Sequence, residues 1–154
     1  LDSFSDLKIL IVGDGPYLKS MKELVQRLKI QDSVRFLGNI NDITYALSVI
    51  DIFVLPAVWR EGFGLSIIEA MAVSKPVIVT NIWALNTLIQ NGVNGILVEP
   101  RSVESLVEAI RRVLNDTTFR EKISKAGQET AQKRFSLDHM VEELETVYQE
   151  LLRV

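Results

Sequence analysis

The sequence predicts an α/β fold, namely a doubly wound, Rossmann-like parallel sheet of about five strands with helices at the C-terminal end. The first two-thirds of the 154 residues alternates short apolar runs with stretches of helical periodicity, and the last third is helical in pattern throughout. Apolar runs without polar alternation are typical of strands that are covered on both faces, as in parallel sheets. Such strand–helix alternation favours right-handed crossovers.

Five short runs rich in isoleucine and valine are the expected strands, and each is bounded by Gly, Pro, Asn or Asp. They are Leu7–Val12, Val34–Leu37, Ile52–Leu55, Val77–Thr80 and Ile96–Val98. The helices expected between them cover about residues 16–29, 42–49, 64–74 and 84–91. Pro16 suits a first helical position, because an N–H there would have no helical partner.

Residues 102–154 are expected to form a helical C-terminal part. The first helix has an apolar stripe, which consists of Val103, Leu106, Val107, Ile110 and Leu114. A second helix covers about residues 117–133, and a third begins after Ser136, whose hydroxyl can cap it. We expect this third helix to bury one apolar side. The residues on that side are Met140, Val141, Leu144, Val147 and Leu151.

The composition narrows the classes of function. With 47% hydrophobic and 24% charged residues, residues 1–154 are expected to fold as a single domain, and the net charge of −3 argues against a nucleic-acid surface. The sequence has no cysteine and one histidine, His139, which excludes thiol catalysis, disulfides and a histidine metal cage. No apolar run reaches the ~18 residues of a membrane helix, and no leader opens the chain. We therefore expect a cytoplasmic protein without a transmembrane segment.

The first glycine-rich loop, Gly13-Asp14-Gly15-Pro16, directly follows the first expected strand. It begins like a dinucleotide-binding fingerprint, but Leu18 stands where the third glycine belongs and Pro16 has no N–H to offer a phosphate. We interpret it as a tight turn into a helix.

The second glycine-rich loop follows Ile52–Leu55 and ends in Gly62-Phe63-Gly64-Leu65, before a strongly apolar helix. Unpaired N–H groups at a helix start, with the helix dipole behind them, suit a diphosphate. Glycines without a Cβ would let the backbone approach such a ligand closely. A helix entry in which the glycines serve only the turn explains the pattern equally well, so both interpretations stay open.

Two glutamates flank this helix start. Glu69 is a lone carboxylate in an apolar helix, so it either faces water or has hydrogen-bond donors nearby. Bound to a ribose, it would accept hydrogen bonds from two vicinal hydroxyls, while Glu61 could reach a group beyond the phosphates. An exposed helix edge shared by Glu69 and Ser66 is the structural alternative.

The stretch from Glu61 to Ala72, followed by Lys75-Pro76-Val77-Ile78, resembles the signature of family 4 retaining glycosyltransferases of the GT-B fold. The hallmark of this family is a pair of glutamates separated by seven residues, as Glu61 and Glu69 are. Further segments match the family in order and spacing, so the resemblance covers nearly the whole chain. They are Leu10–Pro16, Val34–Gly38, Asn91–Val98 and Arg134–Ser136.

The resemblance implies the C-terminal, donor-binding half of a two-domain enzyme that transfers a hexosyl group with retention and needs no metal or other cofactor. Its donor is a nucleotide diphosphate sugar. The residues that the resemblance assigns to donor binding are Ile40, Gly62, Phe63, Gly64, Leu65 and Glu69. Among these, the backbone around Gly64 would hold the diphosphate, Glu69 the ribose and the backbone at Ile40 the base. Glu61 is the expected catalytic residue, as an orienting group for the transferred sugar.

The expected partner of this half is an N-terminal acceptor domain, with the active site in the cleft between the two. The isolated chain is therefore expected to turn over little or no substrate, and the parent protein could associate peripherally with a membrane. A non-catalytic scaffold or binding module of the same fold is the alternative.

The sequence departs from the family pattern in three respects. The missing basic pair, Trp83 and Thr87 favour that alternative, Ser74 is a milder change, and the intact Glu61 and Glu69 favour the enzyme. The donor half of the family normally opens with a strand and a helix that carry a basic pair, and this sequence starts after the place expected for that segment; neither Arg60 nor Lys75 matches the pair. Trp83-Ala84 replaces the usual Gly-Gly, with Thr87 in place of a glutamate, and Ser74 replaces a glycine. Trp83 is expected to fill space that a ligand or the partner domain would otherwise occupy.

Overall fold

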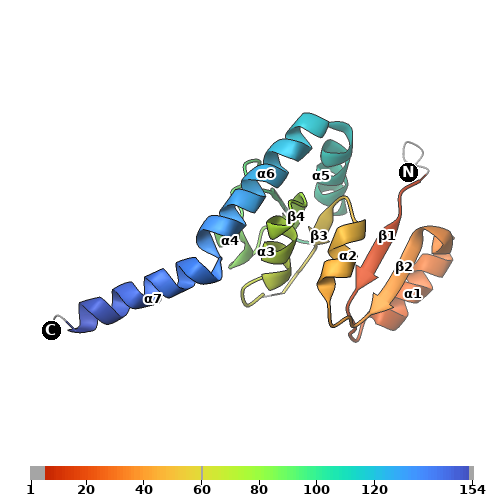
Figure 1. Cartoon of the computed structure of the whole chain (residues 1–154). Coiled ribbons are helices and arrows are strands. Elements are labelled where there is room, and N and C mark those ends of the chain that lie inside the picture. The colour runs from red at the N-terminus through yellow and green to blue at the C-terminus, as the bar shows by residue number, and fades with distance from the viewer. Residues whose placement is uncertain (1–5, 60, 153–154) are drawn as a thin grey trace. The chain divides into compact units, whose positions relative to one another are not determined.

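The computed structural model describes residues 6–59 and 61–152, and the chain divides into two compact units. Unit 1 comprises Leu1–Ala46 and unit 2 comprises Leu47–Val154. Strands alternate with helices in each unit, and all strand pairing is parallel (Figure 1). The α/β class that the sequence predicts is therefore confirmed.

Unit 1 contains two parallel strands connected by a helix. Its elements are β1 (Ile9–Val12), α1 (Leu18–Arg27), a 3₁₀ turn (Gln31–Ser33) and β2 (Val34–Gly38). The register places Ile9 opposite Val34, and a shift after Ile11 brings Val12 opposite Gly38. Helix α2 (Ile43–Val49) continues the chain from unit 1 into unit 2.

Unit 2 contains a three-stranded sheet and most of the helices. Its further elements are β3 (Phe53–Leu55), α3 (Leu65–Ala72), β4 (Val77–Thr80), α4 (Leu85–Leu88), β5 (Ile96–Val98), α5 (Val103–Asn115), α6 (Thr117–Arg134) and α7 (Leu137–Leu152). The strand order is β3-β4-β5. All four residues of the central strand β4 are buried, as expected for a strand covered on both faces.

All five expected strands form, but hydrogen bonding joins them into a pair and a triplet instead of one continuous sheet. Over the described residues, β1 pairs with β2 and β3 pairs with β4. Apolar runs predict where strands form. They do not predict which edges pair, because pairing depends on backbone contacts between segments that are distant in the sequence.

The core of unit 2 lies between its sheet and the helices α5 and α6. Ile78 of β4 packs there with residues of β5, α5 and α6, namely Ile96, Val98, Ala109, Val113 and Ile123. Helix α6 also lies against α3 at Gly127, where a Cβ would be 3.2 Å from the Asn94 carbonyl oxygen and 3.5 Å from Met71 Cγ. Glycine at this position therefore allows the close approach that fixes α3 in place.

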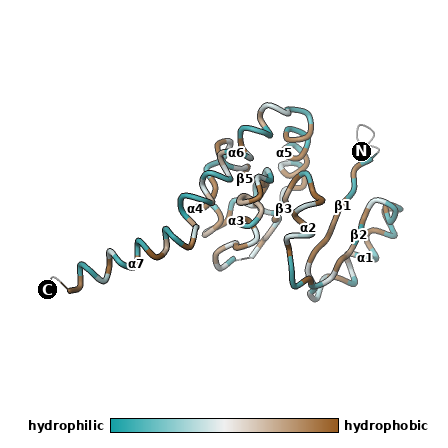
Figure 2. Tube along the Cα trace, in the orientation of Figure 1, coloured by the Kyte–Doolittle hydropathy of each residue, from teal (hydrophilic) through white to brown (hydrophobic). Residues whose placement is uncertain are grey.

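The structure contradicts the expectation that the last helix buries its apolar stripe. Helix α7 has no buried residue, and the five side chains named for the stripe are between 43% and 67% exposed. Hydrophobic residues recur along α7, which extends beyond the end of α6 (Figure 2). The expected cap is confirmed, because Ser136 Oγ accepts a hydrogen bond from the His139 N–H at 3.2 Å. The periodicity thus predicts the helix, whereas burial needs a partner surface that the described residues do not supply.

Candidate functional site

The second glycine-rich loop leaves the sheet at the carboxyl end of β3. The Thr80 hydroxyl, at the end of β4, donates a hydrogen bond to the Leu55 carbonyl oxygen at the end of β3 (3.4 Å). The loops that follow β3 and β4 therefore leave the same edge of the sheet. In open α/β sheets this is the edge at which ligands bind.

Gly64 begins helix α3 in the left-handed region, with φ 81° and ψ 43°. It is buried, and a Cβ at this position would lie 3.0 Å from both Ile67 Cδ1 and Leu85 Cδ2. Glycine is required here for both reasons. Gly62 has no positive φ and open space around its Cα, so its position does not need glycine.

The first turn of α3 leaves amides unpaired. No side chain caps the helix, and the Ile67 N–H bonds to the Gly64 carbonyl oxygen at 2.9 Å. Among the described residues, the N–H groups of Leu65 and Ser66 have no partner. These two donors, at the positive end of the helix dipole, suit an anionic ligand.

The two glutamates differ in exposure. Glu69 is exposed and lies one turn after Leu65 on the face of α3 opposite the buried Ile67 and Met71. Glu61 is half-buried in the loop before the helix. Within the described part of the chain, neither carboxylate has a hydrogen-bond partner. Both carboxylates are therefore available to a ligand. The exposure of Glu69 agrees equally with the structural alternative, in which this residue lies on an exposed edge of the helix.

The predicted site residues divide between the units. Glu61, Gly62, Phe63, Gly64, Leu65 and Glu69 all lie on the loop and first turns of α3 in unit 2. Ile40 belongs to unit 1, where it is half-buried between β2 and α2. The structure therefore brings six of the seven residues together in one unit.

Phe63 has a partner that sequence reasoning missed. Its ring contacts the Phe135 ring edge-on, with centroids 5.8 Å apart and an interplanar angle of 82°. Phe135 follows α6, and the Arg134 guanidinium lies 5.2 Å from the Phe135 ring centroid. The end of α6 thus supports the loop. The segment Arg134–Ser136 matches the family pattern by its order and spacing, and spacing gives no signal for this contact.

The β4–α4 loop carries an exposed tryptophan on a strained turn. Trp83 is 72% exposed, and Ala84 has φ 78° and ψ −48°, where residues with a Cβ are rare. Such a backbone costs about 1–3 kcal/mol. The Thr87 hydroxyl and N–H both donate to the Ala84 carbonyl oxygen, at 2.6 and 3.2 Å. Thr87 therefore holds the turn at the position where the family has its glutamate.

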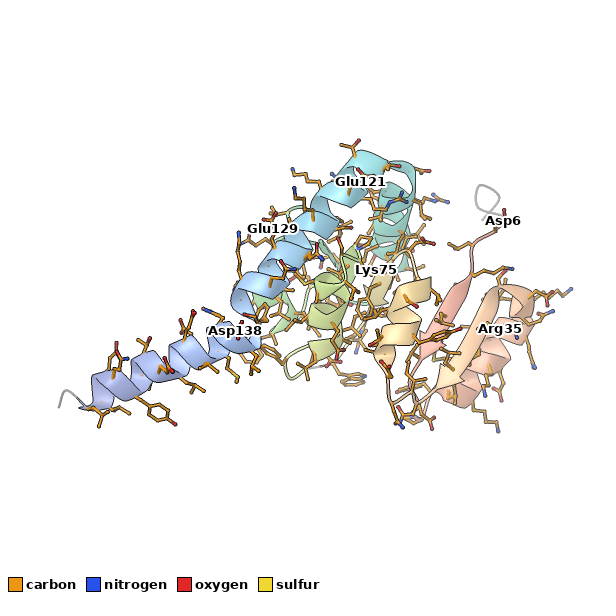
Figure 3. All side chains as sticks on the ribbon, in the orientation of Figure 1. Asp6, Arg35, Lys75, Glu121, Glu129 and Asp138 are labelled. Carbon is orange, nitrogen blue, oxygen red and sulfur yellow. The ribbon has the colours of Figure 1, made fainter. Side chains whose placement is uncertain are left out.

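Lys75 has a structural role. Its amine donates to the Ile50 carbonyl oxygen at 2.8 Å and so joins the segments that precede β4 and β3. Figure 3 labels Lys75 among the side chains of the ribbon. This end of the sheet is opposite the carboxyl edge, so Lys75 supplies no charge to the loop at Gly64. Arg60 lies outside the described residues.

The loop Gly13–Pro16 in unit 1 is a tight turn, as predicted. The Gly13 N–H donates to the Gly38 carbonyl oxygen (2.7 Å), the Gly15 N–H to Asp14 Oδ1 (2.7 Å) and the Leu18 N–H to the Gly15 carbonyl oxygen (3.1 Å). These bonds use amides that a phosphate would need. They also place Pro16 within the turn, so that α1 begins at Leu18, later than expected.

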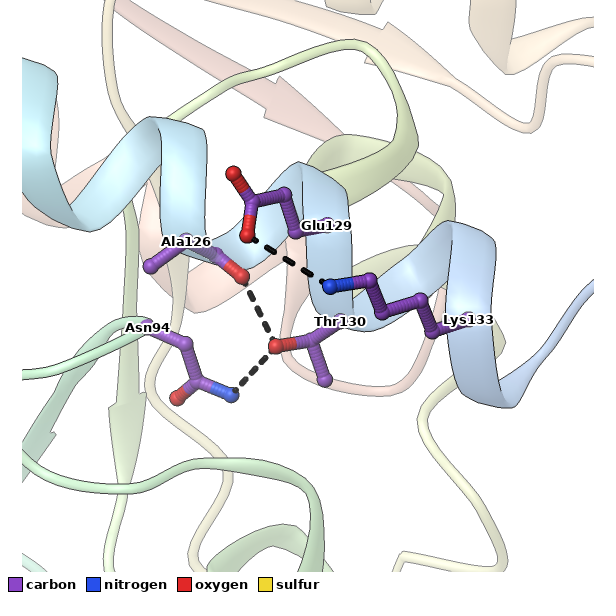
Figure 4. Close-up of polar contacts among 5 residues, drawn as sticks. All are labelled: Asn94, Ala126, Glu129, Thr130 and Lys133. Carbon is purple, nitrogen blue, oxygen red and sulfur yellow. Dashed lines mark hydrogen bonds and ion pairs between the residues drawn. The ribbon is translucent and has the colours of Figure 1, made fainter.

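A buried polar network ties the loop before β5 to α6. The Asn94 amide donates to the Leu88 carbonyl oxygen (3.2 Å) and the Thr130 hydroxyl (3.3 Å), and Asn94 Oδ1 accepts from the Gln90 N–H at 2.7 Å. Figure 4 shows the Thr130 hydroxyl in turn bonded to the Ala126 carbonyl oxygen (2.7 Å). This network anchors the end of α4, which contacts Gly64.

The described residues contain no group of three or more His, Cys, Asp or Glu side chains that could hold a metal ion. None of the helices in the described ranges is long and apolar enough to cross a membrane. The expectations of no metal and no transmembrane segment stay predictions.

An uncapped, glycine-started helix at the carboxyl edge of parallel strands is typical of α/β domains that bind phosphorylated ligands. The chain matches the family model described as glycosyl transferases group 1 over residues 1–130. Among curated relatives, the N-acetyl-alpha-D-glucosaminyl L-malate synthase of Bacillus anthracis is 32% identical over 148 residues, which are 96% of this chain and 39% of the relative. An alpha-1,3-galactosyltransferase of Escherichia coli is 38% identical over 72% of this chain and 29% of its own length.

Solved structures agree with this match. Anabaena HepE in complex with UDP matches with a TM-score of 0.89 and 26% identity over 95% of this chain and 42% of its own. A glycosyltransferase from Rickettsia africae matches with a TM-score of 0.86 and 33% identity, over 96% of this chain and 40% of its own. The chain belongs to the glycosyl transferases group 1 family, has the GT-B fold and aligns with the C-terminal half of these relatives. It spans about two-fifths or less of the length of the curated relatives named above.

Proposed function

We propose that this chain is the donor-binding half of a retaining glycosyltransferase that transfers a hexosyl group from a nucleotide diphosphate sugar to an acceptor. The observation that carries the proposal is the start of α3, where the free N–H groups of Leu65 and Ser66 lie between Glu61 and Glu69. HepE was solved in complex with UDP and with UDP-glucose, which supports UDP as the nucleotide to test first.

In this proposal, the residues act by positioning the donor and by stabilising the leaving group. The acceptor hydroxyl oxygen forms a bond to the anomeric carbon as the bond between that carbon and the diphosphate oxygen breaks. Negative charge develops on the leaving diphosphate, which takes the hydroxyl proton. Donors that are already oriented toward that charge, such as the N–H groups of Leu65 and Ser66, lower the barrier without reorganising. Glu69 accepts hydrogen bonds from the ribose hydroxyls, and Glu61 orients the hydroxyls of the transferred sugar.

The acceptor in this proposal binds to an N-terminal half of the parent protein, in keeping with the 39% of the B. anthracis relative that this chain covers. The isolated chain then binds the donor and turns over little or none of it. A cytoplasmic location, and peripheral membrane contact of the parent protein, belong to the same proposal.

A non-catalytic module of the same fold is the second candidate. It is favoured by the loops at the carboxyl edge, since the described residues 56–59, 61–64 and 81–84 include no lysine or arginine. A diphosphate bound there would be met by amides but by no cation from these segments. Affinity for a nucleotide diphosphate therefore decides between the two candidates.

Calorimetric titration of the chain with UDP and GDP tests the proposal. We expect binding of at least one nucleotide and at least tenfold weaker binding in Glu69→Ala, because two hydroxyl hydrogen bonds to a carboxylate are lost. Glu108→Ala is the matched control, since Glu108 is also exposed and lies on α5, outside the proposed site. Absence of binding of both nucleotides to the unaltered chain would contradict the proposal and favour the non-catalytic module.

A further inference from the structure

Trp83 belongs to a loop that is packed against the proposed donor site. A Cβ on Gly64 would lie 3.0 Å from Leu85 Cδ2 and 3.4 Å from Leu88 Cδ1. Leu85 is fully buried and comes two residues after Trp83. The residue that begins α3 and the start of α4 are therefore in contact, and Trp83 lies directly before this contact.

The turn that presents Trp83 is fixed. Ala84 has a φ of 78° that favours glycine, and the two bonds from Thr87 to its carbonyl oxygen stabilise the turn. A strained backbone persists only where its surroundings determine it, and such strain clusters at ligand sites. The Trp83 side chain is thus directed outward by a defined backbone.

Three aromatic side chains are exposed on the two loops at this edge. Trp83 and Trp59 are 72% and 68% exposed, and Phe63 is 50% exposed. Large aromatic side chains are usually more buried than this, and their exposure together is typical of a binding surface. Among the described residues, the Trp83 indole N–H has no hydrogen-bond partner. Its ring face and its N–H donor are both available.

We propose that Trp83 is a stacking surface for a pyranose ring bound next to the diphosphate. A pyranose has a face of C–H groups that an indole ring covers, and its hydroxyls can accept the indole N–H. The two loops supply complementary parts, with Glu61 for hydroxyls and Trp83 for the apolar face. This inference rests on the proposed function. The pyranose is either the sugar of the donor or a sugar of the acceptor.

Titrations of the full chain with UDP, UDP-glucose and methyl α-D-glucopyranoside test the inference. Trp83→Ala is expected to keep the UDP affinity within twofold and to weaken one of the two sugar ligands at least fivefold, whereas Trp83→Phe keeps most of the affinity. If Trp83→Ala weakens the binding of UDP-glucose, the sugar that stacks on Trp83 is the donor sugar. If it weakens the binding of the glucoside to the UDP-saturated chain, the stacking sugar belongs to the acceptor. Tyr148→Ala, which removes an aromatic side chain that is 62% exposed on α7, outside the two loops, is the matched control.

The inference is overturned if Trp83→Ala binds all three ligands like the unaltered chain, or if it weakens UDP as much as UDP-glucose, which would place the base on the indole. Failure of UDP to bind the unaltered chain would instead refute the proposed function. In that case glucoside binding that depends on Trp83 would still support the pyranose surface, and its absence would refute the surface too.

Discussion

Leu85 packs against Gly64 so closely that a Cβ on Gly64 would lie 3.0 Å from Leu85 Cδ2. This contact joins α4 to the start of α3, at a glycine whose φ is 81°. The backbone conformation and the packing therefore impose the same residue. The free amides of Leu65 and Ser66 depend on both.

Gly64→Ala is expected to lower the free energy of unfolding by about 1–3 kcal/mol, because alanine is strained at a positive φ and its Cβ would crowd one isoleucine and two leucine methyl groups. It should also weaken UDP binding, since the amides that follow shift. Urea unfolding and calorimetry measure the two effects. Gly62→Ala is the control, because its Cβ meets open space. Equal stability of the two variants would contradict the packing.

The Asn94 network predicts a second loss of stability. Asn94→Ala leaves the Gln90 N–H and the Leu88 carbonyl oxygen without their buried partner, which is expected to cost about 1–3 kcal/mol. Asn86→Ala is the control, because Asn86 is exposed and makes one 3.5 Å bond to Asn81. Thermal unfolding of both variants gives the comparison, and a loss in Asn94→Ala no larger than in the control would count against the network.

The pattern of residues predicted most of the local structure and only part of the packing. The apolar run Val77–Thr80 predicted a strand covered on both faces, and all four residues of β4 are buried. The stripe from Met140 to Leu151 predicted α7 correctly and its burial wrongly. Periodicity identifies an apolar face, but the surface that covers it is a property of other segments.

The candidate site was likewise predictable in its local structure but not in its packing. Gly64 could be chosen from sequence, because a glycine directly before an apolar helix is typical of a helix entry. The support of Phe63 by Phe135 could not, since the two residues are 72 positions apart and their contact depends on how α6 lies. The only signal for the strain at Ala84 was the glycine that the family pattern has at this position, because alanine itself gives no sign of a positive φ.

Asp42 offers a pH-dependent test near the start of α2. Hydrogen bonds from the Thr44 side chain and backbone hold the pKa of the Asp42 carboxyl below its usual value of 3.8. Because the folded pKa is lowered, these bonds stabilise the fold above the ordinary pKa, and this contribution is lost as the pH falls through the folded value. Thr44→Val should raise the pKa toward 3.8, as measured by NMR titration of the carboxyl. An unchanged pKa would show that the hydroxyl contributes nothing.

Removal of metal should not affect nucleotide binding. The proposed diphosphate contacts are backbone N–H groups, and the described residues contain no cluster of three metal-ligating side chains. We expect the UDP affinity of the chain to stay within twofold after dialysis against EDTA, as measured by calorimetry. Recovery of tenfold tighter binding on addition of Mg²⁺ would contradict the metal-independent site.

Two non-glycine residues with positive φ predict substitutions that stabilise the protein. Ala84 has φ 78° and Ser74 has φ 59°. Each stands where the resemblance to the family predicts a glycine. Ala84→Gly and Ser74→Gly each relieve strain of about 1–2 kcal/mol and lose about half of that to the greater freedom of the unfolded chain. We therefore expect each to raise the free energy of urea unfolding by about 0.5–1 kcal/mol. Ala72→Gly, at the exposed end of α3, is the control and should lower the free energy of unfolding by about 1 kcal/mol.

The turn at Ala84 also predicts an effect on binding. If the turn directs Trp83, Ala84→Gly will lower the affinity for the pyranose ligand while it stabilises the fold, whereas Ser74→Gly will leave that affinity unchanged. Loss of stability in Ala84→Gly would mean that its backbone is not strained.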